Sequence, residues 1–324
     1  TRPEQLLTSL PQAMRVLTDP VECGPVTLAL PQDVQTMAFD FPEHFFKEKV
    51  HNLRRQLPDE VEMAEAVELI KAAKKPLLVA GGGVHYSGAI AELDNFVSEH
   101  KIPVGETQAG KGALPWDHPQ NMGSMGVTGA ASTNELAAEC DLIIAVGTRL
   151  GDFASGSRTM INPEAKLVSI NVASFDTVKH YGKPLVGDAK LTLPKLGEAL
   201  GSWKPENGWQ QAAVVVKKAW DAYVDEATAD KKTLPLTDPE AVGAVNRAAG
   251  EEDIVVCAAG GLPGELQKLW RTRFSRGYHM EYGFSCMGYE IAGGLGAKMA
   301  KPDSEVYIMV GDGSYLMLNS EIAT

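Results

Sequence analysis

A glycine-flanked aspartate, Asp312, follows an apolar segment near the end of the chain. The order is Glu305-Val-Tyr-Ile-Met-Val310, then Gly311-Asp312-Gly313-Ser314, then a helix-like stretch from Tyr315 to Thr324. A strand that ends in such a turn presents a carboxylate and free backbone N–H groups, which suit a magnesium ion bound together with a phosphate. We therefore expect Asp312 to be a metal ligand. The alternative is a tight turn in which Asp312 caps the next helix.

A second glycine turn, Gly260-Gly261-Leu262, follows an expected strand at Ile254–Ala258. The carboxyl ends of parallel strands lie at one edge of a sheet, where such sheets bind ligands. Two glycine turns at that edge can converge on a single diphosphate. Taken alone, this segment is equally consistent with an ordinary turn.

The stretch from Tyr278 to Tyr289 mixes aromatic, methionine and polar residues and leads into a small-residue helix. We interpret it as a pocket wall, with Met287 as an apolar wedge and Ser285 near a helix N-terminus. The alternative is a core strand with methionine as filler. His279 and Glu281 share one strand face by their spacing, and either contact a substrate or pair with each other, the second being slightly favoured.

Other glycine-rich loops fit known nucleotide motifs poorly. Gly81-Gly82-Gly83 follows a strand but lacks the G-x-G-x-x-G pattern, and the loop Gly105–Gly112 does not place Ser or Thr after Lys111. A nicotinamide or flavin site is therefore weakly supported. His118 stands alone in a loop, which is more typical of a structural histidine.

Composition excludes several classes of function. The 324 residues carry a net charge of −12, with 44% hydrophobic and 22% charged residues, as in ordinary globular proteins. No basic cluster favours nucleic acid, and no apolar run is long enough to cross a bilayer. The four cysteines match no metal-binding spacing, so we expect a reduced, cytoplasmic protein without membrane contact. They are Cys23, Cys140, Cys257 and Cys286.

The order of apolar and helical segments predicts an α/β fold with doubly wound parallel sheets. One helix should begin after Asp59, with Glu62 as a capping-box partner, and Ser87 should cap another. A helix is also expected from Trp209 to Ala229. The expected strands are Gly24–Pro31, Pro76–Ala80, Ile102–Gly105, Asp141–Val146, Lys166–Val172, Pro184–Val186, Ile254–Ala258, Tyr278–Tyr282 and Glu305–Val310.

Taken together, these segments resemble the thiamine-diphosphate enzymes of the acetohydroxyacid synthase and pyruvate oxidase superfamily. Val146-Gly-Thr-Arg149 and Val186-Gly-Asp188 carry the resemblance in the central part, and the two glycine turns carry it near the end. The resemblance implies a pyrimidine-domain tail at 1–50, a central Rossmann-like domain at 51–200, a linker at 201–236 and a truncated diphosphate-binding domain at 237–324.

The resemblance also implies cofactors and roles. Thiamine diphosphate would bind with Mg²⁺ on Asp312, and Met287 would bend the cofactor. The implied cofactor-binding residues are Gly260, Gly261, Leu262, Ser285, Met287, Gly311, Asp312, Gly313 and Ser314. His279 and Glu281 are weak catalytic candidates, while the glutamate that activates the cofactor in this family has no counterpart in this chain. The family implies a homo-oligomer with its active site between subunits.

Within the superfamily, the fit is closer to the carbon–carbon hydrolases that open a cyclic dione in inositol catabolism. Glu106-Thr-Gln-Ala-Gly-Lys111, Leu114–Pro119 and His279–Glu290 carry it, and Glu290-Ile-Ala292 replaces the Gly-Leu-Pro of the synthases. The implied substrate is a small cyclic dione. An acetohydroxyacid synthase or other 2-oxoacid or semialdehyde decarboxylase, and a non-catalytic nucleotide-binding module, stay open as alternatives.

Two departures lead us to expect a fragment that is inactive by itself. The activating glutamate is missing, and so is a second metal ligand, an asparagine downstream of the glycine–aspartate turn. Asn319 is too close to Asp312 to replace it. Asn171-Val172 also stands where flavin-binding relatives carry acidic residues, which argues against bound flavin.

Overall fold

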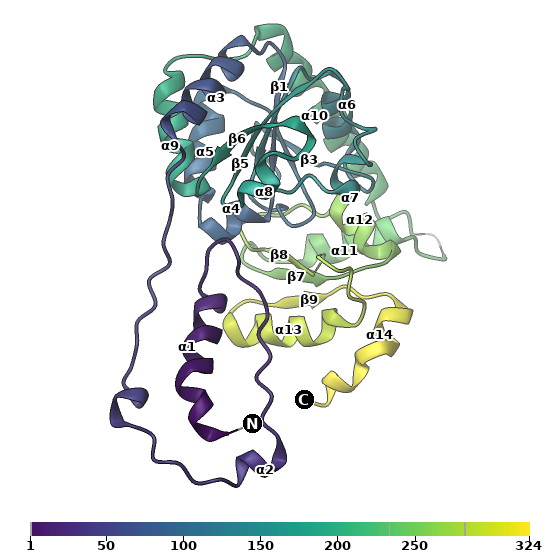
Figure 1. The fold of residues 1–324 in the computed structure, drawn as a ribbon. Coiled ribbons are helices and arrows are strands. Elements are labelled where there is room, and N and C mark those ends of the chain that lie inside the picture. Colours follow the sequence, from purple (N-terminus) through teal and green to yellow (C-terminus); the bar gives the residue numbers. More distant parts are fainter. Residues whose placement is uncertain (1, 233, 282) are drawn as a thin grey trace. The chain divides into compact units, whose positions relative to one another are not determined.

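The computed structural model describes residues 2–232, 234–281 and 283–324 (Figure 1). Thr1, Thr233 in the expected linker and Tyr282 at the expected end of a strand lie outside the described residues. The chain divides into two compact units, residues 1–56 and 57–324.

The first unit consists of short helices joined by extended segments. They are η1 (Pro3–Gln5), α1 (Leu6–Leu17), α2 (Gln32–Gln35) and η2 (Glu43–Phe46). The strand predicted at 24–31 is wrong, because this segment has no strand geometry and its Leu28 and Leu30 are 43% and 52% exposed. A strand needs hydrogen-bonded neighbours, and none of the strands in the described residues pairs with this segment.

A six-stranded parallel sheet forms the centre of the second unit, in the order β3-β2-β1-β4-β5-β6. Its strands are β1 (Pro76–Ala80), β2 (Val104–Glu106), β3 (Asn121–Ser124), β4 (Leu142–Val146), β5 (Lys166–Asn171) and β6 (Lys183–Val186). Every residue of β1 and β4 is buried. Because helices cover both faces, these strands are apolar throughout instead of alternating. The predicted doubly wound fold is confirmed.

Helices connect the strands of this sheet and cover it (Figure 1). They are α3 (Glu60–Ala72), α4 (Gly82–Ser87), α5 (Ile90–His100), α6 (Ala131–Glu139), α7 (Asp152–Ser155), α8 (Ser174–Thr177), η3 (Lys179–Tyr181) and α9 (Ala189–Leu200). The long helix α10 (Asn207–Ala227) follows and packs beside α6 and β3. Its Trp209 is buried, and the indole N–H donates to the Pro76 carbonyl.

Two expected helix caps have different outcomes. Asp59 caps α3 as predicted, since its carboxylate accepts from the Val61 amide at 2.8 Å. Glu62, however, accepts from the Val186 amide and so ties α3 to β6. Ser87 ends α4 and does not cap α5, for which Ala89 is the preceding residue.

The triple glycine after β1 is explained by packing against the turn after β4. A Cβ on Gly81 would lie 2.4 Å from the Gly147 carbonyl oxygen, and one on Gly83 would lie 2.6 Å from the Gly147 Cα. Only glycine permits this backbone approach. This contact accounts for the glycines without a dinucleotide. His118 Nε2 lies 3.2 Å from Asp94 Oδ1, a contact that agrees with the structural role expected for it.

A smaller parallel sheet has the order β8-β7-β9. Its strands are β7 (Ile254–Cys257), β8 (Tyr278–Met280) and β9 (Val306–Ile308). Its helices are α11 (Asp238–Ala248), α12 (Gly261–Leu269), α13 (Tyr289–Ala300), α14 (Asp312–Leu318) and η4 (Asn319–Ile322). A capping box between Thr237 and Glu240 starts α11.

Candidate functional site

The two glycine turns predicted from sequence lie at the same edge of the smaller sheet. Val256 of β7 pairs with Ile308 of β9 in parallel, and the Met309 amide donates to the Val256 carbonyl at 3.0 Å. Both strands therefore end at one level, and each runs through its glycine turn into a helix. Gly260 directly precedes α12 with a φ of +129°, a backbone conformation that favours glycine.

Asp312 is the first residue of α14 and is exposed. Its Oδ1 accepts from the Gly313 amide at 2.8 Å, and Oδ2 has no hydrogen bond among the described residues. One carboxylate oxygen beside a helix start fits a magnesium ion shared with a phosphate, which takes few protein ligands. No group of three or more His, Cys, Asp or Glu in the described part of the chain could enclose a metal.

Met287 lies beside this turn, as its predicted role requires. Its Cε is 3.7 Å from the point where a Cβ on Gly313 would stand, and its side chain is 41% exposed. A ligand anchored by a phosphate at Gly313 would thus meet the methionine with its remaining, apolar part. Ser285, with a φ of +53°, belongs to the exposed turn before Met287. Leu262, in the first turn of α12, is partly buried and packs against the core of the smaller sheet.

A buried carboxylate that the sequence did not mark as functional lies behind the aspartate turn. Glu290 is fully buried, and its oxygens accept from the Ser314 hydroxyl at 2.8 and 2.7 Å. Gly288 N–H lies between the same partners, 3.0 Å from Glu290 Oε2 and 2.7 Å from Ser314 Oγ. The start of α13 and the start of α14 are therefore joined by one hydrogen-bonded cluster.

His279 and Glu281 do not pair with each other, so the favoured interpretation was wrong. His279 Nε2 lies 2.5 Å from the Tyr289 hydroxyl, and burial lowers the pKa of His279. Glu281 instead accepts from the amides of Phe284 and Cys286 at 3.1 and 2.7 Å. Burial raises the pKa of Glu281, but these backbone donors outweigh it and the pKa is lowered.

The glycine-rich loop after β2 meets the smaller sheet, a contact that no sequence pattern predicted. The Tyr278 hydroxyl donates to Gln108 Oε1 at 3.2 Å and accepts from the Cys257 thiol at 3.3 Å. Lys111 is 5% exposed, with its ammonium 5.7 Å from the centre of the Tyr278 ring. Burial lowers the pKa of Lys111 to about 8, although the nearby Glu106 opposes this shift.

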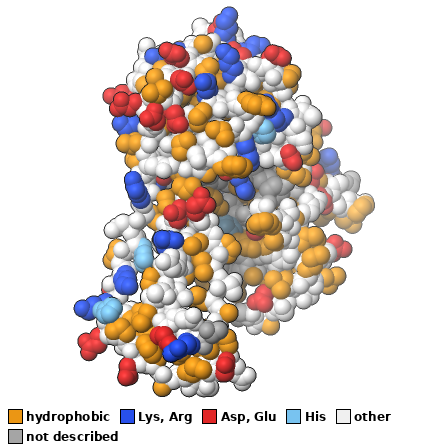
Figure 2. Space-filling view, in the orientation of Figure 1, with side chains coloured by type: hydrophobic (Ala, Val, Ile, Leu, Met, Phe, Trp, Pro, Cys, Tyr) orange, Lys and Arg blue, Asp and Glu red, His pale blue; other side chains and the backbone are white. Residues whose placement is uncertain are grey.

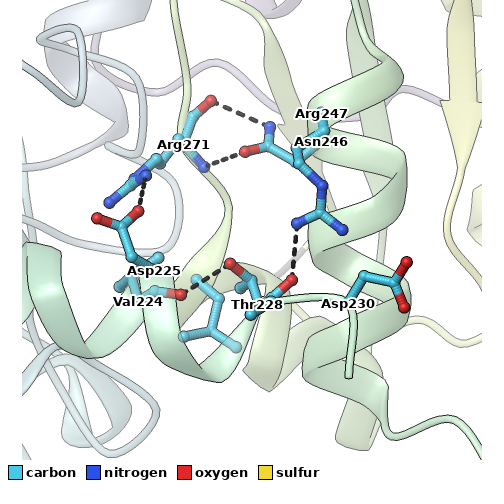
Figure 3. A pocket seen from close by; sticks show the side chains of 9 residues that line it. Val224, Asp225, Thr228, Asp230, Asn246, Arg247 and Arg271 are labelled. Atoms are coloured by element: carbon cyan, nitrogen blue, oxygen red, sulfur yellow. Dashed lines mark hydrogen bonds and ion pairs between the residues drawn. The ribbon is translucent and has the colours of Figure 1, made fainter. Parts of the chain in front are cut away.

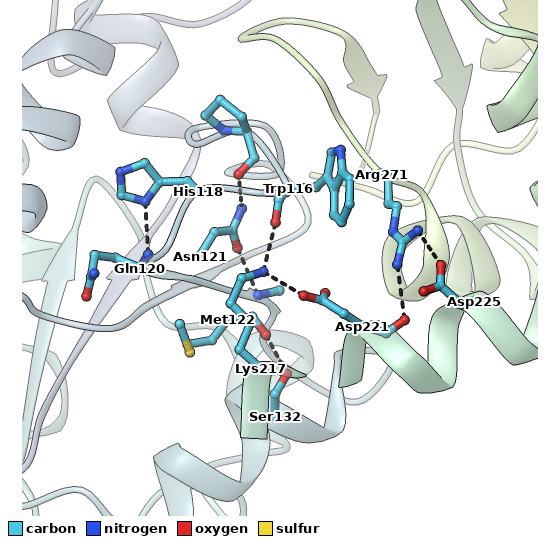
Figure 4. A network of polar contacts seen from close by, with 12 residues as sticks. Trp116, His118, Gln120, Asn121, Met122, Ser132, Lys217, Asp221, Asp225 and Arg271 are labelled. Carbon is cyan, nitrogen blue, oxygen red and sulfur yellow. Dashed lines mark hydrogen bonds and ion pairs between the residues drawn. The ribbon is translucent and has the colours of Figure 1, made fainter. Parts of the chain in front are cut away.

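A second polar cluster joins α10, the Trp116 loop and the segment after α12 (Figure 4). The Arg271 guanidinium stacks on the Trp116 ring at 4.1 Å and donates to Asp225 at 2.6 Å. Lys217 donates to the Trp116 carbonyl at 3.0 Å and pairs with Asp221 at 3.2 Å. The charged groups of this cluster therefore satisfy one another and link the three segments.

A cavity of about 340 Å³ lies at the opposite edge of the smaller sheet (Figure 3). Asn246 and Arg247, at the end of α11, and Arg271, after α12, line it, and these segments precede β7 and β8. Arg247 donates to the Thr228 carbonyl, and Arg271 to Asp225. Ligands bind at the carboxyl ends of parallel strands, so this cavity is not where the glycine turns converge.

Comparison with known families fits the carboxyl-edge site. The family described as thiamine pyrophosphate enzyme, central domain, matches residues 63–196. The thiamine pyrophosphate enzyme, C-terminal TPP binding domain, matches residues 258–324 and so includes both glycine turns. The chain belongs to the thiamine pyrophosphate enzyme family. The resemblance seen in the sequence is confirmed, and with it the expectation of a thiamine diphosphate-binding domain.

Three curated relatives of this chain share one name. The chain is 45% identical to a 3D-(3,5/4)-trihydroxycyclohexane-1,2-dione hydrolase of Clostridium perfringens and 44% identical to one of Bacillus cereus. A Bacillus thuringiensis protein of the same name is 43% identical. Each match covers 100% of this chain and 54% of the relative, so the chain spans about half the length of these relatives.

On the face shown in Figure 2, acidic and basic side chains of residues 57–324 are interspersed, without a broad basic field. Within the described part of the chain, no helix combines the length and the apolar character needed to cross a membrane.

The backbone at Gly260 leads to a stability prediction. Gly260→Ala places a Cβ in a conformation that L residues rarely adopt, and we expect a loss of about 1–3 kcal/mol in the free energy of unfolding. Urea titration followed by circular dichroism measures it. Gly261→Ala is the matched control, since a Cβ there meets nothing within 4 Å and alanine favours the helix. Equal stability of the two variants would contradict the role given to Gly260.

The cysteines offer a second test. Burial raises the pKa of Cys140 and of Cys257 to about 12, while Cys23 and Cys286 are exposed. At pH 8 we expect two thiols to react with iodoacetamide in the folded chain and four in denaturant. A hydrogen bond with Glu281 raises the pKa of Cys286, so Glu281→Gln should increase its thiolate fraction and its alkylation rate. The rate at Cys23 is the internal control; an unchanged rate at Cys286 would exclude this coupling.

Proposed function

We propose that this chain supplies the central and cofactor-binding parts of a thiamine-diphosphate-dependent hydrolase that opens the ring of trihydroxycyclohexane-1,2-dione to 5-deoxy-glucuronate. The observation that carries the proposal is the identity of 43–45% with hydrolases of that name across the whole chain. The position of the Met287 tip beside Gly313 supports the same cofactor.

The proposed cofactor site lies at the carboxyl edge of the smaller sheet. The Gly260 and Gly311 turns, with Gly261, Gly313 and Ser314, would receive the diphosphate at the starts of α12 and α14. Asp312 would hold Mg²⁺ through its free oxygen. When bound, thiamine diphosphate supplies the electron sink that ring cleavage requires.

The reaction consumes one water and breaks one carbon–carbon bond. The hydroxyl of the water becomes part of the new carboxylate, and a proton is added at the other carbon. We assign this proton to the hydroxyl of Tyr289, which lies 2.5 Å from His279 Nε2. Burial lowers the pKa of His279 and raises that of Tyr289, so both groups are neutral in the free site. Tyr289 adjoins Gly288, which bonds to Ser314 at the proposed diphosphate site.

The assembly around this site belongs to the proposal as well. Domain boundaries near residues 51, 201 and 237, a homo-oligomer with the active site between subunits, and a cytoplasmic location stay predictions. We further propose that activity requires the full-length protein, because this chain spans about half the length of the hydrolases it matches. A small cyclic dione is the proposed substrate.

A substrate panel tests the activity. With Mg²⁺ and thiamine diphosphate, the full-length protein should consume the dione with uptake of one water, measured by loss of the dione and appearance of a carboxylic acid. Turnover of pyruvate without dione turnover would support the acetohydroxyacid synthase or decarboxylase alternative. Stabilisation by a dinucleotide, but not by magnesium–thiamine diphosphate, would support a non-catalytic nucleotide-binding module.

The metal assignment is tested by direct binding. In the full-length protein, Asp312→Ala should weaken magnesium-dependent binding of thiamine diphosphate at least about tenfold, about 1.4 kcal/mol, in isothermal titration calorimetry. Asp303→Ala removes an exposed carboxylate from the turn before β9, at the opposite edge of the sheet. This control should bind as the unmodified protein does. Equal affinity of the Asp312 variant would remove Asp312 from the metal site.

A further inference from the structure

The strongest feature outside the predicted site residues is the buried carboxylate of Glu290. Glu290 is the second residue of α13 and is fully buried. In the part of the chain that the structure describes, its carboxylate forms no ion pair with a Lys or Arg. Removing a carboxylate from water is costly unless hydrogen bonds compensate for it. The donors here come from two different helix starts, Gly288 before α13 and Ser314 in the first turn of α14.

These contacts fix the two turns that border the proposed cofactor site. Glu290 and Ser314 are 24 residues apart, so their hydrogen bonds at 2.7–2.8 Å are tertiary contacts. On one side of the cluster, Met287 is covalently adjacent to Gly288. On the other side, Asp312 and Gly313 lead directly into Ser314.

Close packing of α13 against α14 acts together with this cluster. Gly288 has a φ of +92°, and a Cβ there would lie 3.1 Å from Leu318 Cβ, so the α13 start is already pressed against α14. Met287 and Asp312 themselves are exposed. The orientation of both side chains therefore depends on the backbone that the cluster holds.

We propose that Glu290 is a positioning residue that holds the methionine turn and the aspartate turn in register, through Ser314 Oγ and Gly288 N–H. The proposal rests on the proposed function. The loss of Glu290 should therefore affect two kinds of ligand differently. The affinity of a ligand that touches only the aspartate turn should depend less on this register than the affinity of a ligand that also extends past Met287.

Thiamine diphosphate and inorganic pyrophosphate separate these two cases. Both carry the diphosphate, but only thiamine diphosphate has rings that reach the methionine. In the full-length protein with Mg²⁺, Glu290→Ala should weaken the binding of thiamine diphosphate at least about tenfold, within the range for groups that orient metal ligands. The binding of pyrophosphate should be weakened several-fold less. Calorimetric dissociation constants for both ligands measure this ratio without any turnover.

Four further variants keep the test specific. Glu290→Gln retains an acceptor and should recover much of the lost affinity, and Ser314→Ala should match Glu290→Ala. The double variant, with Glu290→Ala and Ser314→Ala together, should lose no more affinity for thiamine diphosphate than either single variant, because the two groups act as a unit. Ile291→Ala, also buried on α13 but outside the cluster, is the control for general destabilisation and should leave the ratio of the two affinities unchanged.

The outcomes are distinguishable. If the unmodified protein does not bind magnesium–thiamine diphosphate, the proposed function fails. If it binds and Glu290→Ala loses the same factor for both ligands, or none, the positioning role is overturned while the proposed function stands. If Ile291→Ala changes the ratio as much as Glu290→Ala, the effect comes from destabilisation of α13 and the positioning role is likewise overturned.

Discussion

The parallel register between β7 and β9 is the constraint on which the candidate site depends. Val256 opposite Ile308 brings the ends of both strands to one level, and each strand then continues through a glycine turn into a helix. A shift of one residue would turn every side chain of β9 to the other face and would separate the turns. Because helix starts carry unpaired N–H groups, this register also concentrates donors at a single edge.

The central sheet supports this edge from outside the smaller sheet. The loop after β2 reaches the smaller sheet through Gln108, whose oxygen accepts from Tyr278 at the start of β8. Buried polar contacts of this kind are specific in direction. Ser124 and Thr128, near β3, both donate to Gln267 of α12, so the helix that follows Gly260 is also held by the central sheet.

The sequence predicted what local pattern and topology control. Continuous apolar runs marked β1 and β4 because both faces are buried, and the strand–glycine–helix order placed Asp312 and Gly260 at one edge. The polar strand Asn121–Ser124 was missed, since its place at the sheet edge is fixed by hydrogen bonds such as Met125 N–H to Glu106 O. The strand prediction at 24–31 was wrong for the converse reason. Its residues are apolar, but apolar character alone does not provide the neighbouring strands with which a strand must pair.

The contacts of Glu290 and Tyr289 escaped prediction, because their partners lie 24 and 10 residues away in the sequence. Glutamate near a helix start ordinarily caps that helix from solvent, and nothing local indicates that this one is fully buried against Ser314. Burial makes this glutamate unfavourable for core stability, because a carboxylate without a cationic partner lowers the stability of an apolar interior. An apolar residue of similar volume would avoid this cost but could not accept from Gly288 and Ser314. The position of Glu290 is thus explained by the two helix starts it joins and not by core packing.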